Sequence, residues 1–90
     1  MLKVSFVGRF KKDYKLCQKR GYNMELLQSI IATLSIPASL PPKYRDHILS
    51  GNYANKRECH IQPDWLLIYQ QTKDELLLYR TGTHADLFGM

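Results

Sequence analysis

The sequence predicts an α+β fold in which two N-terminal helices pack on a small, mainly antiparallel β-sheet. Two observations lead to this prediction. Apolar residues recur at helical spacing in the first third of the chain, and the last third contains three short strand-like stretches separated by connections suited to hairpins. With 90 residues and 44% hydrophobic content, the chain has the size of one compact unit, so residues 1–90 are predicted to form a single domain.

The N-terminal third is predicted to contain one strand and two helices. Residues 2–7, LKVSFV, read as a short strand. The stretch 8–21 places Phe10, Tyr14 and Cys17 at helical spacing, and Gly21 is a natural stop. Asn23 can cap a second helix. Its core-facing residues are expected to be Met24, Leu27, Ile31 and Leu34, widened by Leu26 and Ile30.

The remainder divides into a loop and a strand region. Residues 35–56 contain three of the four prolines and are predicted to form an irregular connection. The stretches 56–62, 65–71 and 75–82 are predicted to be antiparallel strands joined by the short connections QPD and TKD. The runs LLIY and LLLY are apolar enough for central strands of the sheet.

The charge balance favours an anionic partner. Thirteen Lys plus Arg against eight Asp plus Glu give a net charge of +5. A basic stripe on the first predicted helix comprises Lys11, Lys12, Lys15 and Lys19. This stripe either tracks phosphates, with Lys11 and Lys15 as candidates for substrate contact, or is an ordinary solvated face.

The sequence is consistent with a cytoplasmic protein. Cys17 and Cys59 have no metal-binding spacing and are too few for a disulfide framework, so we expect packed free thiols. The N-terminus lacks the pattern of a signal peptide, and no apolar run reaches the length needed to cross a membrane.

Several polar residues lie at positions that an apolar core does not explain. Alternation along 56–62 places Glu58 and His60 on the face opposite Cys59, and a hairpin can bring the Asp64 carboxylate near His60. Further polar and aromatic candidates lie near the ends of other elements, so one cleft can gather them: His47, Arg80, His84 and Phe88. For Trp65 and Phe88, packing and stacking on a nucleobase both remain open.

This set of residues suits cleavage of RNA through its own 2′-hydroxyl. That reaction needs a base, an acid and a cation for the phosphorane-like transition state, and histidine, aspartate and arginine supply all three without a metal or cofactor. A metal site is the alternative. No recognised ligand spacing supports it, and Arg80 beside histidines favours an anion over a cation. A third reading is a non-catalytic RNA-binding or ribosome-binding module, supported by the net charge of +5 and by the lysine stripe.

Three segments, YRDHILSGNY, RECHIQPDWLLIY and YRTGTHADLFG, resemble the YafQ branch of the RelE-like toxins, bacterial type II toxin–antitoxin ribonucleases. The shared pattern is H-x3-G, H-x3-D-W and R-x-G-x-H-x3-F. The resemblance implies the RelE-like microbial RNase fold and metal-independent cleavage of mRNA in the ribosomal A site. The residues implied in the site are His47, His60, Asp64, Trp65, Arg80, His84 and Phe88.

The resemblance also implies roles. His84 matches a candidate general acid, Arg80 would stabilise the scissile phosphate, and Trp65 with Phe88 would help to place either the nucleotides or the walls of the site. The base role stays open among His47, His60 and Asp64. The chain departs from its relatives at Tyr53, where they often have Trp, and near Lys56, where they have an aromatic residue.

The implied partners are mRNA, the ribosome and a neutralising antitoxin. The antitoxin is expected to be DinJ/RelB-like, to fold over the toxin in a hetero-oligomer, and to be encoded beside it. A basic surface suits an acidic partner of this kind as well as rRNA.

Overall fold

A computed structural model of the chain describes residues 1–36, 44, 46–49, 53 and 55–89. Its elements, in chain order, are β1 (Lys3–Phe6), α1 (Phe10–Lys19), α2 (Met24–Leu34), β2 (His47–Ile48), β3 (Arg57–Gln62), β4 (Trp65–Gln71), β5 (Glu75–Gly82) and α3 (His84–Phe88). Much of the predicted irregular connection, including its prolines and Gly51 of the first motif, lies outside the described residues. The short strand β2 lies within that connection and is not predicted from the sequence.

The strands form one sheet in the order β1-β5-β4-β3-β2. β1 runs parallel to β5, whereas the other three pairs are antiparallel, which confirms the mainly antiparallel sheet. β1 pairs with β5 only from Glu75 to Leu78. From Arg80 to Gly82 the edge of β5 is therefore not paired with β1, and α1 contacts this strand.

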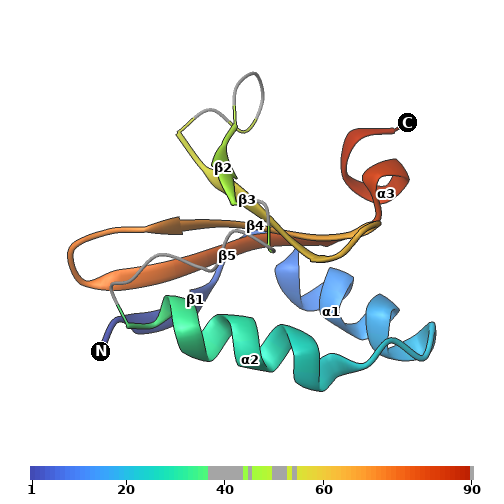
Figure 1. Ribbon diagram of the computed structural model, residues 1–90, viewed down its shortest axis with the longest axis horizontal. Helices are drawn as coiled ribbons and strands as arrows, with labels where there is room; N and C mark the ends of the chain where they lie inside the picture. Colours follow the sequence, from blue (N-terminus) through green and yellow to red (C-terminus); the bar gives the residue numbers. More distant parts are fainter. Residues whose placement is uncertain (37–43, 45, 50–52, 54, 90) are drawn as a thin grey trace.

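Both N-terminal helices lie on one face of the sheet, as predicted (Figure 1). Phe10 and Cys17 of α1 are buried in the main core, with Tyr14 partly buried beside them. In α2 the buried residues are Leu27, Ile30 and Leu34, while Met24 and Ile31 pack at the margin. The prediction that Leu26 widens the core face is wrong, because its side chain is exposed. The Asn23 side chain accepts a hydrogen bond from the Glu25 N–H and caps α2 as expected.

The opposite face of the sheet carries a smaller core and the candidate site. Leu66, Ile68 and Leu87 form a second buried cluster there, and α3 lies on this side of the sheet (Figure 1). The sequence does not predict α3, although its capping box is visible as Thr83-x-x-Asp86. The Thr83 side chain accepts from the Asp86 N–H, and the Asp86 side chain accepts from the Thr83 N–H.

A register shift in β5 determines where Arg80 points. Tyr69 pairs with Leu78, but its neighbour Ile68 pairs with Arg80, so Tyr79 is an extra residue. Leu76 and Leu78 belong to the main core. Without the extra residue, period-two alternation would place Arg80 on that same face. The shift instead aligns Arg80 with Ile68 of the second cluster.

Candidate active site

Three histidines from three separate elements lie next to one another. The ring centroids of His47 on β2 and His60 on β3 are 6.4 Å apart, and those of His60 and His84 on α3 are 5.7 Å apart. The sequence places all three near element ends, and the fold brings them together at the end of the sheet. Adjacent imidazoles in this arrangement can serve both the accepting and the donating side of one proton-transfer reaction.

Glu58 is a member of this cluster that the sequence reasoning missed as a site residue. Its Oε1 lies 3.1 Å from Nε2 of His60 and 3.5 Å from Nε2 of His47. The Glu58 side chain is only 6% exposed, and this single buried carboxylate contacts both imidazoles. The available signal was strand alternation, which places residues 58 and 60 on the same face.

The same contact orients the His60 ring. A carboxylate can only accept, so Nε2 of His60 is the nitrogen that donates to Glu58. Nδ1 of His60 is buried and has no hydrogen-bond partner among the described residues. Glu58 therefore fixes the position of the ring and determines which nitrogen carries the proton when the ring is neutral.

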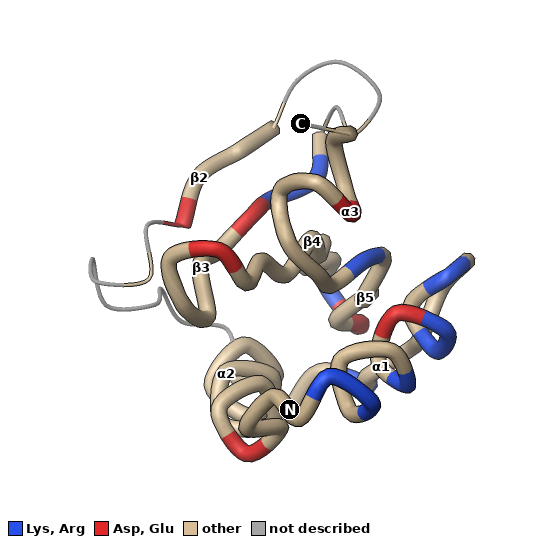
Figure 2. The backbone as a smooth tube through the Cα atoms, turned by 90° about the vertical axis from the view of Figure 1, so that its right-hand side faces the viewer, with Lys and Arg blue, Asp and Glu red and all other residues tan. Residues whose placement is uncertain are grey.

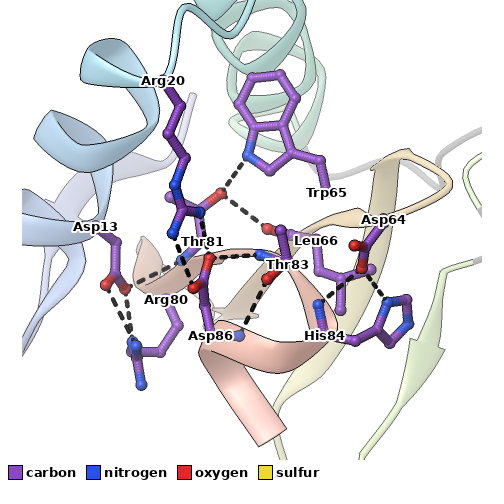
Figure 3. A network of polar contacts seen from close by, with 10 residues as sticks. All are labelled: Asp13, Arg20, Asp64, Trp65, Leu66, Arg80, Thr81, Thr83, His84 and Asp86. Carbon is purple, nitrogen blue, oxygen red and sulfur yellow. Dashed lines mark hydrogen bonds and ion pairs between the residues drawn. The ribbon is translucent and has the colours of Figure 1, made fainter. Parts of the chain in front are cut away.

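Asp64 pairs with His84, whereas the carboxylate that contacts His60 is Glu58. Its Oδ1 is 2.6 Å from Nδ1 of His84 and 2.9 Å from the His84 backbone N–H (Figure 3). These backbone and side-chain hydrogen bonds hold the pKa of Asp64 below its usual value. Since Nδ1 donates to the carboxylate, Nε2 of His84 is the nitrogen that can exchange a proton with a substrate.

Arg80 is held by a carboxylate from α1. Its Nε donates to Oδ2 of Asp13 at 2.6 Å and its Nη2 to Oδ1 at 3.3 Å (Figure 3). This hydrogen bonding to Asp13 raises the pKa of Arg80. The third nitrogen, Nη1, donates to the Tyr53 hydroxyl at 3.3 Å. One edge of the guanidinium is thus anchored, while the other points toward the aromatic residues of the site.

Phe88 and Tyr53 connect Arg80 to the histidines. The Tyr53 and Phe88 rings meet edge-on with centroids 5.8 Å apart, and Phe88 lies 6.5 Å from the His84 ring. Tyr53 contacts both Arg80 and Phe88. The contacts therefore bring together the predicted site residues His47, His60, Asp64, Arg80, His84 and Phe88, with Glu58 and Tyr53 among them.

Trp65 lies elsewhere, and of the two roles left open for it the structure supports core packing. It is 1% exposed in the main core, where its ring packs against Tyr22 at 4.9 Å between centroids. Its indole N–H donates to the Thr81 hydroxyl at 3.0 Å (Figure 3). A nucleobase cannot reach a ring that is enclosed on the helix-covered side of the sheet, so packing is the role that the structure assigns to Trp65.

Lys11 and Lys15 are also apart from the histidines. They lie on α1, where the Lys and Arg positions gather on the backbone tube of Figure 2. With Phe6, Phe10, Tyr14 and Gln18 they line a cavity of about 290 Å³. This cavity is formed by β1 and α1, on the helix-covered side of the sheet, so these lysines and the histidine cluster do not share one cleft.

Two further predictions concern the cysteines and metal binding. Cys17 and Cys59 are both free and buried, as expected, and burial raises the pKa of each thiol. Over the described ranges, no three His, Cys, Asp or Glu side chains are grouped so as to hold a metal ion. Within the same residues, no helix is long and apolar enough to cross a membrane.

Comparison with known proteins gives the family. The family model for the bacterial toxin of type II toxin–antitoxin systems, YafQ, matches residues 2–89. The chain belongs to this toxin family. The mRNA interferase toxin YafQ of Escherichia coli strain K12 is 43% identical over 89 residues, which cover 96% of this chain and 95% of that protein.

Solved structures agree with the fold. The E. coli DinJ–YafQ complex contains a chain with a TM-score of 0.89 and 40% identity, covering 99% of this chain and 100% of that one. A metal-bound toxin from Helicobacter pylori has a TM-score of 0.90 and 41% identity, covering 98% and 100%. The predicted family and the α+β fold are therefore confirmed.

Proposed function

We propose that this YafQ-family toxin is an endoribonuclease, an mRNA interferase, that cleaves mRNA at the ribosomal A site by metal-independent acid–base catalysis and so inhibits translation. The observation that carries the proposal is the pairing of each histidine with a carboxylate in one cluster beside an arginine. The 43% identity to an mRNA interferase over nearly the whole chain supports the same reaction class.

The proposed chemistry is a phosphoryl transfer within the RNA. The 2′-oxygen attacks the neighbouring phosphorus and loses its proton to a base, while the bond from phosphorus to the 5′-oxygen breaks and that oxygen receives a proton from an acid. The products are a 2′,3′-cyclic phosphate and a 5′-hydroxyl. No metal is required, because the side chains can provide both proton transfers and the positive charge.

The roles follow from the contacts. His84, whose Nδ1 is held by Asp64, has Nε2 available to protonate the leaving oxygen. The proton-accepting side is the His47–Glu58 pair, and His60, whose Nε2 donates to Glu58 and whose Nδ1 is buried, holds that carboxylate in place. Arg80 faces the charged phosphorus with the edge that Asp13 does not occupy, and Phe88 forms the wall on which a nucleotide packs.

The proposed partners are an antitoxin, the ribosome and mRNA, in the cytoplasm. E. coli YafQ forms a complex with DinJ, so we propose a DinJ-like antitoxin and a toxin–antitoxin hetero-oligomer for this chain. The net charge of +5 supports binding to an acidic segment or to rRNA.

The test is cleavage in a translation reaction. Purified protein is added with and without ribosomes and with and without a chelator, and mRNA 5′ ends are mapped by primer extension. We expect cuts that need ribosomes, persist in chelator and disappear in the His84→Ala variant. Cleavage that chelator abolishes would replace this mechanism with a metal-dependent one, a relevant control because an H. pylori relative has been solved with metal bound.

A non-catalytic binding module is the second candidate, favoured by the lysines along α1 (Figure 2). It predicts ribosome or RNA binding that weakens with salt and with Lys11→Ala or Lys15→Ala, and no cut product from folded protein. The same translation reaction therefore separates the two functions.

A further inference from the structure

Helix α1 makes two ionic contacts with the segment that carries Arg80 and His84. Asp13 binds Arg80, and Arg20, just past the end of α1, binds Asp86 (Figure 3). Asp13 and Arg20 are about two helical turns apart, so they leave the helix on the same side. Their partners lie at the two ends of residues 80–86, which turn from β5 into α3.

The first contact is nearly buried. The side chains of Asp13 and Arg80 are only 9% and 15% exposed. Oδ2 of Asp13 also accepts from the Thr81 backbone N–H at 3.3 Å, so the carboxylate holds both the side chain and the strand of the arginine. Thr81 is fixed on its other side by Trp65 and by the Leu66 carbonyl (Figure 3).

A charge in this position is unusual for a helix that packs on a core. Asp13 lies among the buried residues of α1, between Phe10 and Cys17. For stability alone, an apolar residue of similar volume is often as good as a buried ion pair. The carboxylate is better explained by what it does to Arg80: it anchors two nitrogens and leaves Nη1 directed at Tyr53 in the site.

The second contact acts on the turn before His84. Arg20 reaches both carboxylate oxygens of Asp86, at 2.5 and 3.1 Å. Oδ2 of Asp86 also accepts from the Thr83 N–H at 2.9 Å, which closes the cap of α3 one residue before His84. At Gly82, where φ is +156°, a Cβ would lie 2.8 Å from Oδ2 of Asp86. Glycine thus provides the space in which Asp86 meets both Arg20 and Thr83.

We propose that Asp13 and Arg20 are positioning residues for the reaction, and that α1 sets the spacing and orientation of Arg80 and His84 through the Asp13–Arg80 and Arg20–Asp86 contacts. This inference rests on the proposed ribonuclease function. Neither residue touches the substrate in this proposal. Asp13 acts through the guanidinium, and Arg20 acts through Asp86 and the α3 cap on the backbone that carries the His84 imidazole.

The experiment uses two variants with matched controls. Asp13→Asn removes the charge with little change in shape, and Arg20→Ala removes the bidentate contact to Asp86. The matched controls lie in the β4–β5 turn, far along the sheet from the site. Asp74→Asn removes a negative charge, as Asp13→Asn does, and Lys73→Ala removes a positive charge, as Arg20→Ala does. Arg20→Lys is the conservative variant, which keeps a charge that can still reach Asp86.

Three quantities are measured on each full-length variant: the single-turnover rate of cleavage of ribosome-bound mRNA, the NMR signals of the three imidazoles in the free protein, and resistance to urea. We expect the cleavage rate of Asp13→Asn and Arg20→Ala to fall about 10- to 100-fold at saturating ribosomes. KM should change little. In Arg20→Ala the His84 imidazole signals should shift while those of His47 stay in place, and Arg20→Lys should recover most of the rate.

The proposal is overturned if the two variants cleave at the rate of the wild type once folded, even when they unfold at lower urea, because the contacts would then serve stability alone. Wild-type cleavage is the separate control for the function itself. If the wild type makes no cuts, the ribonuclease function fails, but the His84 signals still report whether Arg20 positions that ring. If Asp13→Asn does not fold, the cleavage rates and His84 signals of Arg20→Ala and Arg20→Lys still test the proposal.

Discussion

Replacing Trp65 with Phe tests whether this residue belongs to the fold or to the substrate surface. The change removes the hydrogen bond from the indole N–H to the Thr81 hydroxyl, which contributes about 1 kcal/mol. The smaller ring also leaves part of a fully buried space empty, at a further cost of about 1–2 kcal/mol. We therefore expect the free energy of unfolding to fall by about 2–3 kcal/mol.

The assay is urea and thermal unfolding followed by circular dichroism, since Trp65 is the single Trp of the chain and its fluorescence is lost in the variant. For a domain of this size, the expected loss corresponds to a decrease in Tm of about 10–20 °C. The cleavage rate per folded molecule should stay close to that of the wild type. Phe88→Leu, on the opposite face, is the matched control and should mainly reduce cleavage. A Trp65→Phe variant with unchanged stability but weakened substrate binding would refute the assignment of Trp65 to the core.

Three other experiments, two with variants and one with the unchanged protein, test the electrostatics of the structure. Glu58→Gln should slow cleavage by about 10-fold or more, because two imidazoles lose their shared carboxylate; Glu75→Gln is the control, and equal rates would exclude this role. Asp86→Asn should lower the free energy of unfolding at about pH 7, and its difference from the wild type should shrink as the pH falls below about 3.8. Arg20 holds the pKa of folded Asp86 below its ordinary 3.8, so below about pH 3.8 the folded state binds fewer protons than the unfolded state and loses this stabilisation. A stability difference between variant and wild type that stays constant down to about pH 3 in urea unfolding would contradict this. Cys17 and Cys59 should react with a thiol reagent only after unfolding, since burial raises the pKa of both, and fast labelling of native protein would show this to be wrong.

Local sequence patterns predict the elements and the faces of this fold well. The spacing of Phe10 and Cys17 locates the buried side of α1, and strand alternation places Glu58 and His60 on one face, away from Cys59. These patterns succeed because helix and strand periods are properties of the backbone itself. The α3 helix was missed because it is short and its signal is a capping box instead of an apolar period.

Partners across the fold were harder to predict. Asp64 is close to His60 in sequence, yet it contacts His84, because the pairing of β4 with β5 returns the chain to the β3–β4 turn. Arg80 likewise meets Asp13 from the other end of the chain. Such contacts depend on strand order and on the extra residue at Tyr79, and neither is encoded in a local period.

The short length of β1 connects the fold to the site. If β1 continued alongside β5 as far as Gly82, its backbone would occupy the edge that α1 now contacts. Asp13 could then not accept from the Thr81 N–H or reach Arg80, and Arg20 would be moved away from Asp86. Ending the parallel pairing at Leu78 gives up a few ladder hydrogen bonds, each contributing about 1 kcal/mol at most. The freed edge of β5 is where α1 contacts Arg80 through Asp13 and the α3 cap before His84 through Arg20 and Asp86.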